Sequence, residues 1–132
     1  MRSSAESVVR EFLGAWANPK ADELASFLSD EAIWVDGPQG VRRGRNAIIA
    51  ELIGQLAISR GIGIEVDTLL ASGGTVMVEW HGVWTMGGNP ITAKVMATFE
   101  IDPNGRISQM REYYDLQSLI DQIESAGFPV TK

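Results

Sequence analysis

The period of the hydrophobic pattern changes once along this 132-residue chain, from roughly 3.6 residues before Gly63 to 2 residues after it. A period of 3.6 places apolar side chains on one face of a helix, whereas a period of 2 places them on one face of a strand. The first half is therefore expected to be mainly helical and the second half to form a sheet. This order predicts an α+β fold, in which helices cover one side of a strongly bent antiparallel sheet.

Three helices and one short strand are predicted before the change of period. The first helix follows a capping-box pair, Ser3 and Glu6, and the second is expected to begin at residues 18–19, an Asn-Pro pair. Residues 31–37, EAIWVDG, are typical of a brief strand, and residues 46–60 carry the apolar spacing of a third helix.

Four β segments and a terminal helix are predicted after it. The segments are residues 64–72, 75–86, 91–101 and 106–114. Short turn sequences rich in glycine, asparagine and proline separate them, so neighbouring segments should pair as antiparallel hairpins. Asp115 is a candidate N-cap for the helix that follows, residues 116–125.

Composition excludes several classes of protein. Hydrophobic residues make up 45% of the chain and charged residues 21%, which is ordinary for a soluble globular domain. No apolar run approaches the length that spans a bilayer, and an acidic residue comes too early for a signal peptide. There is no cysteine, which excludes disulfides and thiolate chemistry. We therefore expect one cytoplasmic domain over residues 1–132, with no membrane partner.

The charge balance argues against nucleic acid as a partner. The formal net charge is −6, from 17 acidic and 11 basic residues, which opposes binding to a phosphate backbone. The one basic cluster, Arg42, Arg43 and Arg45, is interpreted as a solvated loop that leads into the third helix.

The alternation in the later strands predicts an apolar cavity on the inner face of the sheet. The inward residues would be Val76, Val78, Trp80, Gly82 and Trp84 in one strand, and Ile91, Ala93, Val95, Ala97, Phe99 and Ile101 in the next. Small residues among them, at 82, 93 and 97, would leave room opposite large aromatic side chains. The room could hold an apolar ligand, or the same side chains could simply pack against the helices.

Two acidic residues interrupt the apolar face. Asp36 has the parity of Trp34, and Glu112 has the parity of Met110 and Tyr114. If both reach the cavity, burial and mutual repulsion should raise their pKa values, so that one carboxyl could act as an acid and the other as a base. The alternatives are that Asp36 caps a loop and that Glu112 is an exposed or salt-bridged acid at a sheet edge.

No metal or cofactor site is predicted. His81 is the only histidine, and its parity places it on the outer face of the sheet, unless a bulge near Gly82 shifts the register. Acidic residues are scattered without a recognisable ligand spacing. The phosphate-binding loop, the dinucleotide fingerprint and the serine-hydrolase motif are all absent.

Several strings in the chain resemble the nuclear transport factor 2-like superfamily, in the branch that holds limonene-1,2-epoxide hydrolases, ketosteroid isomerases and SnoaL-like polyketide cyclases. The strings are VVREFLGAW (8–16), LASFLSDEAIWVDGP (24–38), RRGRNAI (42–48) and ATFEIDPNGRISQMREYYDL (97–116). The last is the most specific, and the resemblance runs from about Ala5 to Phe128. It implies a cone-shaped fold, a deep apolar pocket and a homodimer formed through the outer face of the sheet.

The epoxide hydrolase pattern carries over only in part. The aspartate that activates water in those enzymes matches Glu112, but their arginine falls at Trp80 and their second aspartate at Gly82. Their tyrosine and asparagine fall at Trp34 and Asp36. The resemblance thus implies that Asp36 would have to protonate the substrate oxygen in place of the missing arginine.

The ketosteroid isomerase pattern also carries over in part. The base aspartate of those enzymes is similar in place to Asp36, whereas their oxyanion-hole tyrosine falls at Phe12 and their protonated aspartate at Ala97. SnoaL-like cyclases use a pocket acid as a base on a C–H bond that is already acidic. That chemistry tolerates these substitutions best.

The sequence and the resemblance together favour a small cofactor-independent enzyme that uses acid–base chemistry on an apolar oxygenated molecule, such as a terpenoid, steroid or polyketide. Isomerisation, cyclisation and epoxide hydrolysis are the expected reactions; the alternative is a non-catalytic ligand-binding or dimeric accessory domain. The predicted catalytic residues are Asp36 and Glu112. The predicted ligand contacts are Phe12, Trp34, Trp80, Trp84, Phe99, Met110 and Tyr114.

Overall fold

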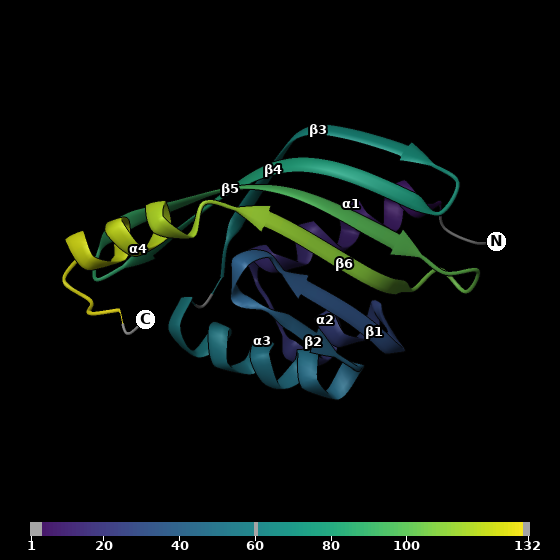
Figure 1. Cartoon of the computed structure of the whole chain (residues 1–132), viewed down its shortest axis with the longest axis horizontal. Coiled ribbons are helices and arrows are strands. Elements are labelled where there is room, and N and C mark those ends of the chain that lie inside the picture. Colours follow the sequence, from purple (N-terminus) through teal and green to yellow (C-terminus); the bar gives the residue numbers. More distant parts are fainter. Residues whose placement is uncertain (1–3, 60, 131–132) are drawn as a thin grey trace.

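The computed structural model describes residues 4–59 and 61–130, and it confirms the predicted α+β class (Figure 1). The helices are α1 (Ala5–Gly14), α2 (Ala21–Ser26), α3 (Arg45–Ser59) and α4 (Leu116–Ser125), with two short 3₁₀ turns, η1 (Ala15–Ala17) and η2 (Gly37–Gln39). The strands are β1 (Leu28–Asp36), β2 (Val41–Arg43), β3 (Gly63–Ser72), β4 (Thr75–Met86), β5 (Asn89–Ile101) and β6 (Ile107–Tyr114).

All six strands form a single sheet in the order β2-β1-β6-β5-β4-β3. Figure 1 shows the sheet bending from β3 at one edge to β1 and β2 at the other, with α4 following the end of β6 and lying beside the start of β5. The predicted antiparallel pairing of β3, β4, β5 and β6 is confirmed. The parallel pairing of β1 with β6 was not predicted, because it joins segments that lie more than seventy residues apart and leaves no local signature.

The helix boundaries differ from the predictions near the N-terminus. Ser4 is the N-cap of α1, and its side chain accepts a hydrogen bond from the backbone N–H of Ser7 at 3.1 Å; the predicted cap, Ser3, lies outside the described residues. The prediction that α2 begins at residues 18–19 is wrong. The 3₁₀ turn η1 prolongs the path of α1, so that α2 begins only at Ala21, after an extended Lys20.

The core lies between α1 and the inner face of the sheet. The predicted alternation is confirmed in β4 and β5, whose inward side chains are buried while those between them are mostly exposed. Phe12 of α1 packs edge-on against Phe27 and Phe99, with ring centroids 5.5 and 5.9 Å apart. This aromatic cluster fills the part of the inner face that lies away from α4.

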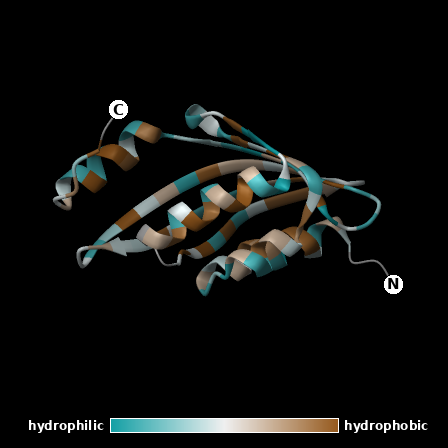
Figure 2. Ribbon diagram, turned by 90° about the horizontal axis from the view of Figure 1, so that it is seen from below, coloured by the Kyte–Doolittle hydropathy of each residue, from teal (hydrophilic) through white to brown (hydrophobic). Residues whose placement is uncertain are grey.

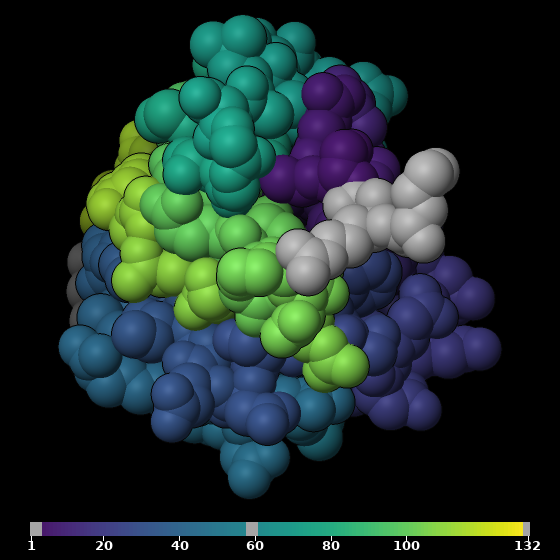
Figure 3. All heavy atoms as spheres, turned by 90° about the vertical axis from the view of Figure 1, so that its right-hand side faces the viewer, coloured from purple at the N-terminus to yellow at the C-terminus, as the bar shows by residue number. Residues whose placement is uncertain are grey.

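Helix α4 lies at one end of this core, where Leu119 packs against it. Its predicted N-cap is confirmed, since the Asp115 carboxylate accepts a hydrogen bond from the backbone N–H of Ser118 at 3.0 Å. In Figure 2 this helix, next to the C label, alternates brown and teal, as an amphipathic helix does. Figure 3 shows the opposite end of the molecule, with the β3–β4 turn in teal and the β5–β6 turn in green.

Candidate functional site

A cavity of about 770 Å³ lies on the inner face of the sheet, towards the end of the molecule that carries α4. Most of its walls are aromatic or aliphatic side chains from α1, β4, β5, β6 and α4. Eight of the nine predicted site residues line it: Phe12, Trp34, Asp36, Trp80, Trp84, Met110, Glu112 and Tyr114. The cavity is large enough for a molecule of several rings, and its lining suits an apolar one.

Two predictions about the walls of the cavity need correction. Phe99 does not belong to the lining, because its ring is fully buried against Phe12 in the aromatic core. Gly82 does not leave open space either. A Cβ at this position would lie 2.6 Å from Cγ2 of Ile62 and 3.0 Å from Cζ3 of Trp80, so those two side chains already occupy the room.

The parallel pairing of β1 and β6 brings the two predicted acids together. Asp36 is the register partner of Glu112, and Trp34 is the register partner of Met110. Side chains at paired positions of adjacent strands point to the same face, so both carboxyls face the cavity. Glu112 lies on a central strand rather than a sheet edge, and Asp36 does not cap a loop, because its side chain bonds to Tyr114 and Arg42.

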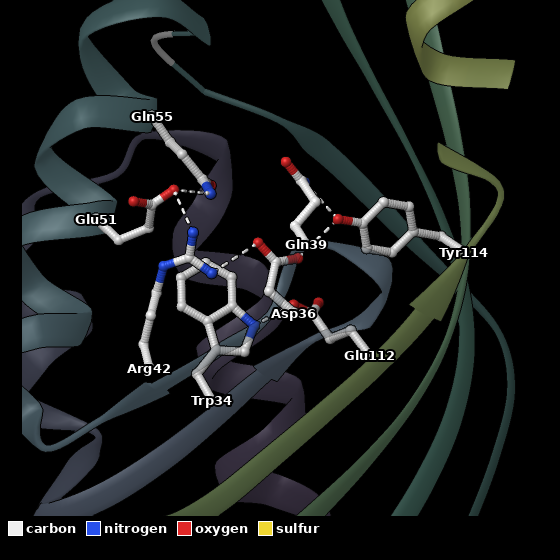
Figure 4. Close-up of polar contacts among 8 residues, drawn as sticks. All are labelled: Trp34, Asp36, Gln39, Arg42, Glu51, Gln55, Glu112 and Tyr114. Atoms are coloured by element: carbon white, nitrogen blue, oxygen red, sulfur yellow. Dashed lines mark hydrogen bonds and ion pairs between the residues drawn. The ribbon is translucent and has the colours of Figure 1, made fainter. Parts of the chain in front are cut away.

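The Glu112 side chain makes one hydrogen bond within the part of the chain that the structure describes. The indole Nε1 of Trp34 donates to its Oε1 at 2.6 Å (Figure 4). Burial raises the pKa of Glu112 from an ordinary 4.5 to about 7; the Trp34 hydrogen bond opposes this rise, and the negative charge of Asp36 adds to it. A carboxyl with this pKa exists in both protonation states near neutral pH.

Asp36 is held by two donors. The hydroxyl of Tyr114 donates to its Oδ1 at 2.8 Å, and Nη1 of Arg42 lies 3.3 Å from its Oδ2. Burial has the largest effect on the pKa of Asp36 and raises it overall, although the Tyr114 hydrogen bond and the Arg42 charge act to lower it. Since both carboxylate oxygens accept from a donor, the contacts favour the ionised form of this side chain.

Tyr114 links Asp36 to the loop after β1. Its hydroxyl donates to Asp36 and accepts a hydrogen bond from Nε2 of Gln39 at 2.5 Å. Burial raises the pKa of the Tyr114 hydroxyl, so it keeps its proton. The loop approaches closely because residue 37 is glycine: its φ is +43°, and a Cβ there would lie 2.9 Å from the Glu112 carbonyl oxygen.

Arg42 is a residue of the candidate site that the sequence interpretation missed. Arg42 and Arg43 form strand β2 rather than the predicted solvated loop, and Arg42 pairs with Trp34 across the strands. Its guanidinium lies 5.4 Å from the Trp34 ring centroid and 3.2 Å from Glu51, which also accepts from Gln55 at 3.2 Å (Figure 4). Arg42 therefore ties Asp36 to helix α3.

A signal for these additional residues was present in the sequence. Glu51 and Gln55 follow the buried Ile48 at spacings of three and seven, which places them beside the apolar stripe of α3. The glycines at 37 and 40 allow a tight return of the chain after β1. That return brings Arg42 opposite Trp34.

His81 lies on the outer face of the sheet, as its parity predicted. Its Nδ1 is 2.9 Å from the Asp67 carboxylate and its Nε2 is 3.4 Å from Glu65; the hydrogen bond with Asp67 raises the pKa of the imidazole. Within residues 4–59 and 61–130, no group of three or more histidines and acids is arranged to hold a metal ion. None of the helices described is long and apolar enough to cross a membrane.

Known structures share this fold over most of the chain. An LEH-like epoxide hydrolase of Mycobacterium tuberculosis superposes with a TM-score of 0.79 at 23% identity, covering 92% of this chain and 90% of that one. A hypothetical protein of Catenulispora acidiphila with a ketosteroid isomerase-like fold, solved with trimethylamine, gives 0.80 at 19% identity, covering 98% and 100%.

A third similar structure is the epoxide hydrolase/cyclase-like enzyme SalBIII, which functions in pyran ring formation in the polyether salinomycin. It gives a TM-score of 0.77 at 20% identity, covering 86% of this chain and 92% of that one. At such identities the likeness shows the fold alone. No curated protein matches the sequence significantly. The sequence model of the SnoaL-like domain matches residues 9–110, and this chain therefore belongs to the SnoaL-like domain family.

Proposed function

We propose that this protein is an enzyme that moves protons on an apolar, oxygen-containing small molecule, with Glu112 as the general base. One observation carries the proposal: the Glu112 carboxyl lies in a largely apolar cavity with one hydrogen-bond donor among the described residues, and burial raises its pKa to about 7. A group that titrates near the working pH can both take a proton and return it, which is what acid–base catalysis requires.

Asp36 supports Glu112 in this proposal instead of acting as a second acid. Tyr114 and Arg42 occupy its two oxygens and favour the carboxylate, whose negative charge raises the pKa of Glu112. Asp36 also orients the hydroxyl of Tyr114 at the cavity wall. This division of roles differs from the expectation that Asp36 would protonate the substrate, and it leaves protonated Glu112 as the proton donor.

The reactions that suit one shuttling carboxyl are isomerisation and cyclisation. Glu112 would remove a proton from an activated C–H bond or a hydroxyl and deliver it to another atom of the same molecule. Activation of water for epoxide opening uses the same base. The epoxide hydrolase and the cyclase-like enzyme among the similar structures support these reaction classes, and the apolar lining supports a terpenoid, steroid or polyketide as substrate.

We further propose that this single SnoaL-like domain, residues 1–132, works as a cytoplasmic homodimer. Support comes from apolar side chains on the outer face of the sheet, away from the cavity. Met77, Met96 and Tyr113 are 49%, 44% and 56% exposed, and Met96 is the register partner of Tyr113. Met77 lies diagonally from Met96, because its partner in β5 is Thr98, the next outward position. A stripe of exposed apolar side chains on a sheet face suits pairing with a second copy.

The proposal is tested by turnover of three probes: limonene 1,2-epoxide, 5-androstene-3,17-dione and a 4,5-epoxy alcohol. We expect at least one probe to react, with kcat/KM rising with pH through the pKa of Glu112, near 7. Loss of a general base typically costs about 10²–10⁴-fold, and we expect Glu112→Gln to fall by that amount. Glu79→Gln, an exposed acid on the outer face, is the matched control and should leave kcat/KM unchanged.

A second measurement needs no substrate. The Trp34 indole proton bonded to Glu112 should report the ionisation of that carboxyl in ¹⁵N–¹H spectra, with a midpoint near pH 7 that is absent in Glu112→Gln. Probes that bind without any turnover, with a Trp34 midpoint near the ordinary pKa of 4.5, would instead favour a non-catalytic binding domain.

A further inference from the structure

The indole N–H of Trp80 is a buried donor that has no partner among the residues described. Trp80 is 7% exposed and lines the cavity, and its Nε1 makes no hydrogen bond with any group of the described residues. Trp34, on strand β1 and in the lining of the same cavity, donates its indole N–H to Glu112. A buried donor left unpaired destabilises a fold, so such groups in proteins usually serve something besides packing.

Gly82 determines how the Trp80 ring lies. A Cβ at residue 82 would come within 3.0 Å of Cζ3 of Trp80, so the six-membered ring of the indole covers the place where any larger residue would project. Within an indole, Cζ3 and Nε1 stand on opposite edges. The N–H edge of Trp80 is therefore turned away from Gly82, and this orientation depends on the glycine.

The strand register places Trp80 at a defined distance from the two carboxyls. Trp80 pairs with Val95 of β5, and Val95 pairs with Tyr114 of β6, so the three residues form one row across the sheet. Strands are spaced about 4.8 Å apart, which puts Trp80 about 10 Å from the strand that carries Glu112. Val95, on the strand between them, lines this part of the cavity.

We infer that the Trp80 N–H binds an acceptor oxygen of the ligand, remote from the atom on which Glu112 acts. An indole N–H donates only, so its partner is a carbonyl, ether or similar oxygen and not a cation. The ligand is then an apolar molecule of two or more rings with oxygens at both ends. Because Nε1 is covered in the conformation described, a lining side chain must rotate as the ligand binds.

This inference rests on the proposed function only because it concerns the same cavity. It is tested by ligand binding and not by turnover. The probes are 2-acetylnaphthalene and 2-ethylnaphthalene, which have the same shape and differ by one carbonyl oxygen. The four tryptophans give four indole signals, and the Trp80 signal is the one lost in Trp80→Phe. We expect 2-acetylnaphthalene, but not 2-ethylnaphthalene, to move the Trp80 indole proton downfield.

Affinities measured by calorimetry complete the test. One neutral hydrogen bond corresponds to about a 5–10-fold change in Kd, so Trp80→Phe should weaken 2-acetylnaphthalene by that factor and leave 2-ethylnaphthalene within about twofold. The matched control, Trp84→Phe, removes the N–H of another cavity tryptophan and should affect both probes equally. Equal losses in Trp80→Phe, or a Trp80 signal that the ketone does not move, would overturn the inference.

Two further readouts keep the test decisive. Unliganded Trp80→Phe loses packing volume as well as the N–H, so its unfolding temperature is compared with that of Trp80→naphthylalanine, which keeps two fused rings but has no N–H. The two-ring variant should unfold at the wild-type temperature or higher, because only an unpaired donor has been removed; a hydrogen-bonded tryptophan would give a lower one. If Trp80→Phe does not fold, the wild-type Trp80 signal is assigned from the losses in Trp16→Phe, Trp34→Phe and Trp84→Phe. In Glu112→Gln, 2-acetylnaphthalene should still move the Trp80 indole proton downfield. If no probe is turned over but this shift is seen, only the proposed function is refuted.

Discussion

At the scale of the residue, Glu112 couples the stability of the fold to its own titration. Its pKa in the folded protein is about 7, against an ordinary 4.5, so between these values the folded state binds more protons than the unfolded chain. The contribution of Glu112 to the stability of the fold is fully present below pH 4.5 and is lost as pH rises through 7. We predict that the free energy of unfolding falls by up to about 3 kcal/mol over this window, at about 1.4 kcal/mol for each unit of pKa shift.

The Glu112→Gln variant should lack this slope, because glutamine cannot titrate and still offers an oxygen to the Trp34 N–H. Urea unfolding at pH 5, 6.5 and 8 measures the difference, with Glu79→Gln as a control that keeps the wild-type slope. The titration of Asp36 also makes the free energy of unfolding fall as pH rises, because burial raises its pKa as well. This effect is present in both the wild type and the variant. Parallel pH profiles for wild type and Glu112→Gln would contradict the prediction.

At the scale of the element, α4 is attached to the sheet through Gln122. Its side-chain amide accepts from the backbone N–H of Thr92 at 2.8 Å and donates to the Thr92 carbonyl at 2.9 Å. The pairing of β5 with β6 begins only at Val95. The backbone N–H and carbonyl of Thr92, three residues earlier, therefore have no partner in β6. Gln122 replaces the missing strand, and α4 in turn contributes Leu119 and Ile120 to the cavity.

We predict that Gln122→Ala loosens α4 and opens the cavity, at a cost of about 1–3 kcal/mol for the two backbone groups left unpaired. Hydrogen exchange at the Thr92 amide should accelerate, and a cavity probe such as 2-acetylnaphthalene should bind more weakly. Gln117→Ala is the matched control, because that glutamine lies on the same helix and bonds only to Asp121, at 2.8 Å among the described contacts. Unchanged exchange at Thr92 in Gln122→Ala would show that apolar packing alone holds the helix.

At the scale of the whole molecule, the two faces of the sheet have separate tasks in our proposal. The inner face holds the cavity, and the outer face holds the stripe of Met77, Met96 and Tyr113. We predict that the protein sediments as a dimer and that Met96→Lys shifts it towards monomer, because a desolvated ammonium group opposes association. Lys94→Met, on the same strand and face, is the control and should not weaken the dimer. A wild-type monomer at high concentration would refute the pairing.

The sequence by itself determined which side chains share a face. Alternation in residues 75–86 and 91–101 identified the inner residues of β4 and β5, and the same reasoning placed Asp36, Glu112 and Tyr114 on the cavity side. Face assignment succeeds because the period of a strand is a local property of the backbone. The cap at Asp115 was predictable for the same reason, since a capping bond joins neighbours in sequence.

Only the tertiary structure decided which of these residues meet. The parallel pairing of β1 with β6 brings Asp36 beside Glu112. Arg42 reaches Asp36 because its segment forms the short strand β2 and not the predicted solvated loop. In the tertiary structure Phe99 packs in the core and does not line the cavity, and Trp80 occupies part of the space beside Gly82. These outcomes depend on contacts between distant segments and on how side-chain volumes fit together. Neither produces a repeating pattern in the sequence from which it could be predicted.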